Sequence, residues 1–266
     1  MTTIAYPLAA RSLEVSDLLK LRRKRGLVAT VALLTIGAIA ITYGAIELLH
    51  VIDATKHGPA GGIDNLGHGA FVLAALGAVA ATVVGATVGA GDLEAGVYRE
   101  LVVTGRSRLR LYVSRLIGGM AFVLPFVAVA YALAAIATVV FAGDRPAPDT
   151  HLLITTGLWD LLDAALYYLL AFGVACLTGA RSYTIGIVLA WRLAVTPILA
   201  SISALGIVRE LVPGVALQNL TPAALGDAAQ QGPRVGMSVA AVAAVLLVWA
   251  AAAVAIGAWR DTTRDA

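Results

Sequence analysis

The chain has 266 residues, of which 60% are hydrophobic and only 13% are charged. A soluble domain carries about 25% charged residues, so this composition excludes a soluble enzyme, a disordered segment and a disulfide-stapled secreted domain. The single cysteine, Cys176, excludes an intramolecular disulfide. The mean hydropathy of +0.88 indicates an integral membrane protein, in which the placement of charges matters more than the net charge of +3.

The first predicted element is an amphipathic helix over residues 12–25. Ser12 can cap this helix, Val15 and Leu18 recur at helical spacing, and basic residues gather at its end. Such a helix lies on the inner leaflet of a membrane, with its Lys and Arg side chains at anionic headgroups. A plain, positively charged flank is the alternative.

Six apolar runs follow, each long enough for the roughly 20 residues that a membrane-spanning helix needs. They cover residues 27–49, 70–90, 111–142, 152–178, 184–206 and 236–259. None shows the alternation of a barrel strand, so helices are expected. The expected fold class is all-α, with residues 1–266 forming a single transmembrane domain of six membrane-spanning helices.

The basic residues predict the orientation of these spans. Most of the 19 Lys and Arg residues precede the first span, follow the second or follow the sixth. The opposite side holds Lys56, Arg145, Arg209 and Arg234. By the positive-inside rule both termini are cytoplasmic. Together with the Ala-rich composition, this predicts a multi-pass protein of a bacterial cytoplasmic membrane.

The cytoplasmic loop over residues 91–110 carries the most informative pattern. Leu93, Val97 and Leu101 recur every four residues, which predicts a short amphipathic helix that Gly105 ends. A helix in this position, joined to two spans, could transmit force from a soluble partner. A charged loop that only fixes the topology is the alternative.

The outer loop over residues 207–235 is apolar but interrupted by Pro and Gly, among them Pro213, Pro222 and Gly226. Its apolar pieces are too short to cross a membrane. Two short helices that re-enter the outer leaflet explain this composition, provided that protein or water satisfies the broken backbone. A compact outer loop is the alternative.

Ionisable residues inside spans are candidates for function, because they are costly to bury in lipid. Arg192 lies within the fifth span, where it could face a conduit, snorkel towards the interface or bond to backbone carbonyls. Asp160 and Asp163 fall towards the outer end of the fourth span, so we expect no acidic partner at the depth of Arg192. We expect these two aspartates in an outer interfacial turn; a substrate exit or a dimer contact is the alternative.

Several catalytic motifs are missing. None of the three lysines precedes Ser or Thr, so the chain has no phosphate-binding P-loop and cannot bind ATP in that way. No H-E-x-x-H motif is present, and the histidines near the first outer loop match no closed metal motif. We therefore expect no catalytic residues, no metal and no cofactor in this chain.

The loop motif resembles a known family. Glu94-x-Gly96, then Leu101-Val102, Thr104-Gly105-Arg106-Ser107-Arg108 and Tyr112 to Arg115 resemble the first cytoplasmic loop of ABC-2-type transporter permeases. The layout with an interfacial helix, six spans and an outer re-entrant segment is similar as well. The resemblance implies a coupling helix that docks on an ATPase, with these coupling residues: Glu94, Gly96, Arg99, Glu100, Gly105, Arg106, Ser107 and Arg108.

The resemblance also implies partners. Two separate ABC ATPase subunits would bind ATP and Mg²⁺, and a second permease, identical or similar, would complete the path; membrane lipids surround the complex and no nucleic acid is expected. The chain alone is then no enzyme. Its cargo could be a lipid, a hydrophobic drug, antibiotic or peptide, or a polysaccharide precursor, with Arg192 as a possible conduit residue.

Two other function classes share this topology. An ion-coupled secondary transporter would need paired acidic or His residues at mid-membrane and internal repeats, neither of which the sequence indicates. A membrane anchor or sensor subunit that transports nothing would need no coupling helix.

Overall fold

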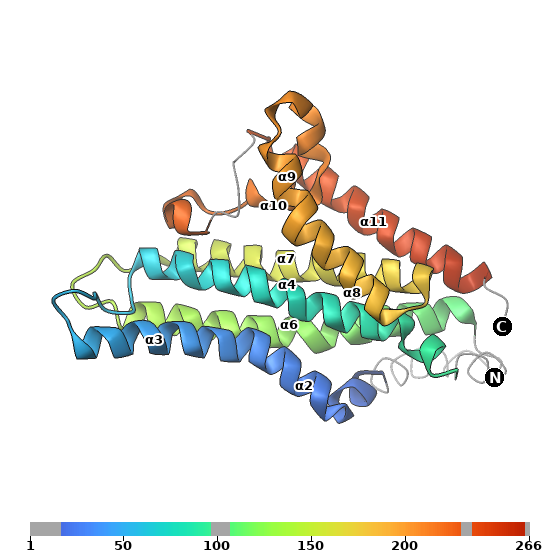
Figure 1. Cartoon of the computed structure of the whole chain (residues 1–266), viewed down its shortest axis with the longest axis horizontal. Coiled ribbons are helices and arrows are strands. Elements are labelled where there is room, and N and C mark those ends of the chain that lie inside the picture. The colour runs from blue at the N-terminus through green and yellow to red at the C-terminus, as the bar shows by residue number, and fades with distance from the viewer. Residues whose placement is uncertain (1–16, 97–106, 230–235, 264–266) are drawn as a thin grey trace, which may run out of the picture.

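The computed structural model describes residues 17–96, 107–229 and 236–263, and every regular element within these ranges is helical (Figure 1). Six helices in this part of the chain are long and apolar enough to cross a membrane. Their bounds are Arg25–Ile52, Ile63–Glu94 (α4), Arg108–Val140 (α6), Thr150–Thr178 (α7), Arg181–Ser201 and Val239–Thr263 (α11). The protein is therefore an all-helical, multi-pass membrane protein, as its apolar runs predict.

The first and fifth spans are each interrupted by a wider, π-helical turn. The first consists of α2 (Arg25–Ala32) and α3 (Ala38–Ile52), and the fifth of α8 (Arg181–Ala190) and α9 (Thr196–Ser201). The turn in the fifth span, Trp191–Val195, directly precedes Pro197. Proline has no N–H for the carbonyl four residues earlier and its ring clashes with that carbonyl, so the backbone widens there. Arg192 lies in this widened turn.

Several predicted boundaries differ from the structure, among them the start of the second span, which lies at Ile63 instead of residue 70. The fifth span ends at Ser201 instead of continuing to residue 206, because the backbone becomes extended at Ile202 and adopts a positive φ at Gly206. The second span continues beyond residue 90, as α4 runs without a break to Glu94. The start of the predicted coupling helix, at Leu93, is thus the end of α4, and residues 97–106 lie outside the described part of the chain.

Helix α4 packs most extensively against α7, and glycines allow their backbones to approach closely. A Cβ atom at Gly85 would lie 2.6 Å from the carbonyl oxygen of Tyr168, and one at Gly89 would lie 2.5 Å from Ala175 Cβ. Small residues four apart permit such contacts between membrane helices. This glycine pair therefore serves packing within the chain and sets the position of α7 beside α4.

Helices α8 and α11 run obliquely to the set formed by α3, α4, α6 and α7 (Figure 1). In the chain, the fifth span and α11 are connected through two 3₁₀ segments, Ser203–Leu211 and Ala223–Ala229, and the short helix α10, Pro213–Gln218. All six residues of α10 are buried. The Trp159 indole donates a hydrogen bond of 3.1 Å to the Leu217 carbonyl and so holds α10 against α7.

Candidate functional site

The predicted coupling residues fall into two groups. Arg99, Glu100, Gly105 and Arg106 lie outside the described residues. Glu94 and Gly96 lie at the end of the described residues that precede residues 97–106. Ser107 and Arg108 lie at the start of the described residues that follow them. Four of the eight predicted coupling residues are thus described, and they lie on the two sides of residues 97–106.

The Glu94 carboxylate contacts another span. It accepts a hydrogen bond of 2.6 Å from the backbone N–H of Arg181, the first residue of α8. Helix N-termini have free N–H groups and a positive partial charge, so a carboxylate stabilises them. Glu94 therefore ties the end of α4 to the start of the fifth span, an intramolecular role that the sequence pattern did not predict.

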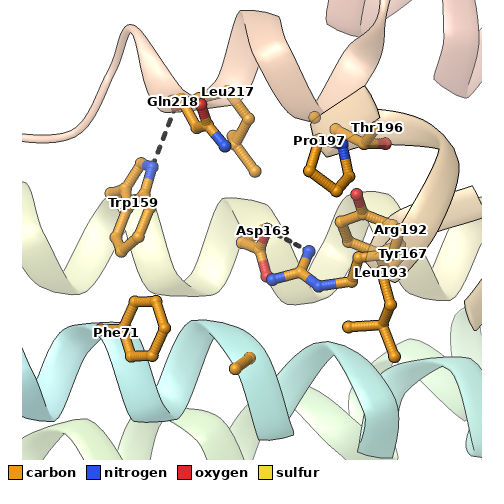
Figure 2. Close-up of a pocket in the computed structure, with 12 residues that line it drawn as sticks. Phe71, Trp159, Asp163, Tyr167, Arg192, Leu193, Thr196, Pro197, Leu217 and Gln218 are labelled. Carbon is orange, nitrogen blue, oxygen red and sulfur yellow. Dashed lines mark hydrogen bonds and ion pairs between the residues drawn. The ribbon is translucent and has the colours of Figure 1, made fainter. Parts of the chain in front are cut away.

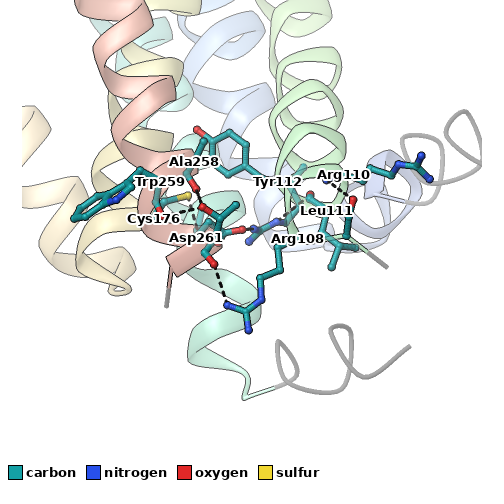
Figure 3. A network of polar contacts seen from close by, with 12 residues as sticks. Arg108, Arg110, Leu111, Tyr112, Cys176, Ala258, Trp259 and Asp261 are labelled. Atoms are coloured by element: carbon teal, nitrogen blue, oxygen red, sulfur yellow. Dashed lines mark hydrogen bonds and ion pairs between the residues drawn. The ribbon is translucent and has the colours of Figure 1, made fainter. Parts of the chain in front are cut away.

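Ser107 and Arg108 fix the start of α6. The Ser107 side chain is the N-cap and accepts from the backbone N–H of Arg110. The Arg108 guanidinium donates to the carbonyl oxygen of Thr262 at 3.2 Å, in the last turn of α11 (Figure 3). Both contacts anchor the chain immediately after residues 97–106, within the predicted coupling loop.

A buried ion pair lies about two helical turns further along α6. Arg115 Nη2 is 2.7 Å from Asp261 Oδ2, and the two side chains are only 6% and 1% exposed. One turn away, the Tyr112 hydroxyl donates to the Val254 carbonyl at 2.7 Å. The start of α6 is therefore joined to the end of α11 by a buried ion pair and by a hydrogen bond beside it.

The N-terminal residues join the same end of the bundle. Residues 17–23 are helical, so the described part of the predicted 12–25 helix ends at residue 23; Lys24 is not helical and Arg25 already begins α2. Lys20 forms an ion pair with Asp92 of α4, and Ser114 of α6 donates to Asp17 at 2.6 Å. Partial desolvation, and then the charge of Lys20, lower the pKa of Lys24. This helix thus bridges α4 and α6.

Arg192 occupies a second polar site, inside the bundle. Its guanidinium lies 2.9 Å from Asp163 Oδ1 (Figure 2). The guanidinium donates to the Ala74 carbonyl at 2.7 Å as well. It also lies over the ring of Tyr167, 4.2 Å from the centroid, a cation–π geometry. The expectation that Arg192 has no acidic partner is wrong.

The expectation is wrong because it placed Asp163 and Arg192 at different depths along their helices. At 1.5 Å per residue, Asp163 lies about 22 Å from the Thr178 end of α7 and Arg192 about 16 Å from the Arg181 end of α8. Both are thus near mid-helix, and the long arginine side chain covers the remaining difference. The expected interfacial turn for Asp160 and Asp163 is wrong too, since these residues are 1% and 2% exposed inside α7.

A pocket of about 210 Å³ adjoins this ion pair. Its wall comes from α4, α7, the fifth span and α10, and includes Phe71, Trp159, Asp163, Arg192 and Gln218 (Figure 2). The sequence pattern indicated Arg192 alone. Asp163 could have been found by pairing it with Arg192, since a charge buried in lipid needs a partner.

Across the described ranges, no three His, Cys, Asp or Glu side chains gather in a way that could hold a metal ion. The two polar sites are therefore built from ion pairs and hydrogen bonds. They can hold helices together, bind a polar group or transmit a displacement.

No protein-family model matches the chain, and no curated protein matches it.

Proposed function

We propose that this chain is the permease subunit of an ABC-2-type exporter in a bacterial cytoplasmic membrane. In this proposal it moves a lipid, a hydrophobic drug or antibiotic, or a similar molecule outward. Separate ATPase subunits bind and hydrolyse ATP with Mg²⁺, and a second permease, identical or similar, completes the path. The short helical segments after Ser201 correspond in the proposal to the outer re-entrant segment.

The observation that carries the proposal is the way in which the flanks of residues 97–106 are fixed. The α4 flank is held to α8 through Glu94 and to residues 17–23 through Asp92. The α6 flank is held to α11 through Arg108 and through the buried Arg115–Asp261 pair. A partner that displaces this segment therefore moves several spans together, which is what coupling to an ATPase requires.

Charge reversal within the segment tests the proposal. We expect Glu100→Arg combined with Arg106→Glu to abolish recovery of a P-loop ATPase that co-purifies stoichiometrically with the wild-type chain from its native host, because reversed charges repel a complementary surface. These positions are better probes than Glu94 and Arg108, which have intramolecular contacts. Lys56→Glu is the matched control, because this exposed residue belongs to the opposite side of the predicted topology.

Undiminished ATPase recovery and transport in the double variant would show that the coupling assignment is wrong. Absence of an ATPase from the wild-type preparation, even after cross-linking through position 99 or 106, would also contradict it.

One observation favours a second candidate, an ion-coupled secondary transporter. Asp160, Asp163 and Arg192 lie buried near mid-helix, and buried ionisable residues of this kind serve ion coupling in such transporters. Proteoliposomes that contain the chain alone distinguish the candidates. Transport driven by a proton gradient without ATP would favour the second.

A further inference from the structure

The pocket of about 210 Å³ between α4, α7, α10 and the fifth span has the character of a ligand site. It is mostly apolar, with Phe71, Trp159 and Tyr167 as aromatic walls and a few polar groups among them, which is typical of small-molecule sites. Phe71 is 38% exposed, and Leu193, which also lines the pocket, is 63% exposed. Because these exposed walls are apolar residues of membrane-spanning helices, the pocket opens towards the lipid.

The lining of the pocket offers a ligand no counter-charge. Its charged residues are Asp163 and Arg192, which pair with each other at 2.9 Å. Their side chains are only 3% and 5% exposed, and Asp163 Oδ2 has almost no accessible surface. A charged ligand would lose its hydration in this pocket without gaining an opposite charge, which is costly. The pocket therefore favours a neutral molecule.

The side-chain amide of Gln218 faces the same space (Figure 2). Its oxygen, Oε1, has almost no accessible surface and no described hydrogen-bond partner. Its nitrogen, Nε2, also has no described partner but keeps accessible surface, so it is the amide atom that a ligand can reach. A buried donor without an acceptor costs about 1–3 kcal/mol. A ligand that brings an acceptor oxygen to Gln218 is therefore favoured over a pure hydrocarbon.

We propose that this pocket binds a small, neutral, lipophilic molecule through one acceptor oxygen, of the kind that a ketone or an ester carries. The carbonyl oxygen of the ligand accepts a hydrogen bond from Gln218 Nε2, and its apolar body lies against the rings of Trp159 and Phe71. An apolar cavity of about 150 Å³ binds benzene. The volume of about 210 Å³ therefore accommodates a benzene ring with a short substituent.

Two sources offer such a group, namely a free lipophilic molecule dissolved in the membrane and the ester of a neighbouring phospholipid. The inference concerns binding to this chain alone and does not depend on an ATPase. Its outcome is thus independent of the test of the proposed function.

The test measures saturable binding of tritiated acetophenone to the full chain in phosphatidylcholine nanodiscs at neutral pH, with each affinity expressed against the concentration in the bilayer. Unlabelled α-methylstyrene has the same shape but a CH₂ group in place of the ketone oxygen. It should compete about threefold to tenfold more weakly than unlabelled acetophenone, because a neutral hydrogen bond contributes about 0.5–1.5 kcal/mol. The charged analogues of similar shape, 1-phenylethylammonium and benzoate, should compete more weakly still.

The same measurement in nanodiscs of ether-linked phosphatidylcholine, which has no ester carbonyls, distinguishes the two sources. Tighter binding of acetophenone in these nanodiscs assigns the site to a phospholipid ester that acetophenone displaces. Unchanged binding assigns it to a free lipophilic molecule.

Two pairs of variants locate the site. Gln218→Leu should bind acetophenone and α-methylstyrene equally, whereas Asn219→Leu, which removes the neighbouring amide outside the pocket, should keep the preference for the ketone. Ala75→Phe fills the pocket and should abolish saturable binding, whereas Ala132→Phe, on the exposed face of α6, should not.

Four results would each overturn the proposal. They are absence of saturable binding or of a preference for the ketone in the wild-type chain, tighter binding of 1-phenylethylammonium than of acetophenone, an unchanged preference for the ketone in Gln218→Leu, and full binding by Ala75→Phe.

Discussion

At the scale of single residues, the Arg115–Asp261 pair is the contact with the largest expected effect on stability. Asp261→Asn preserves the shape of the side chain but leaves a buried guanidinium without its carboxylate. Breaking a buried ion pair in this way costs about 3–5 kcal/mol. We expect the unfolding midpoint of the purified chain in a detergent titration to fall accordingly.

The exposed Asp53–Lys56 pair provides the matched control. Hydrogen bonds from Thr55 and then Lys56 lower the pKa of Asp53, but this carboxylate is in contact with solvent. Asp53→Asn should therefore leave the midpoint unchanged. An equal response of both variants would mean that the Arg115–Asp261 pair contributes no more than a surface contact.

The sequence predicts the polar residues of these sites better than their partners. Arg192 is recognisable as a charge inside an apolar run, and the basic residues near Arg108 by their cluster. The pairing of Arg192 with Asp163 depends on the rotation and tilt of two helices and on the π-helical turn at Trp191–Val195. Those features arise from tertiary packing, which the local pattern does not contain.

At the scale of elements, the close approach of α4 and α7 is the contact that the glycines make possible. A side chain at Gly85 would collide with the backbone of α7, whose carbonyl oxygen at Tyr168 cannot move aside like a flexible side chain. We expect Gly85→Leu to destabilise the chain by about 1–3 kcal/mol or more, as overpacking does. The same detergent titration measures this effect.

Gly91→Ala is the control on the same helix. No atom lies within 4 Å of the added Cβ, and alanine favours a helix over glycine by up to about 1 kcal/mol. Its midpoint should stay unchanged or rise. A tolerated Gly85→Leu would show that α4 and α7 lie further apart than the structure places them.

At the scale of the whole molecule, the six spans are predictable because each depends on its own composition. The ends of the spans are less predictable, because they depend on backbone geometry. In the fifth span, Pro197 follows the widened turn, and the positive φ at Gly206 lies beyond the point where the helix has ended. The oblique course of α8 and α11 (Figure 1) is not predictable from apolar runs, because every face of such a run is compatible with lipid. The buried position of α10 likewise depends on Trp159 and the neighbouring helices.

The orientation in the membrane is the remaining property at this scale, and cysteine labelling tests it. Replacing Cys176, the only cysteine, with Ala gives a background without thiols. In intact cells, a membrane-impermeant maleimide should label Lys56→Cys but neither Ser182→Cys nor Thr263→Cys, and permeabilisation should expose all three. The reason is the excess of basic residues on one side and an even number of spans. Labelling of both Ser182→Cys and Thr263→Cys, but not of Lys56→Cys, in intact cells would show the inverted topology. Opposite behaviour of Ser182→Cys and Thr263→Cys would contradict a crossing by both the fifth and the sixth span.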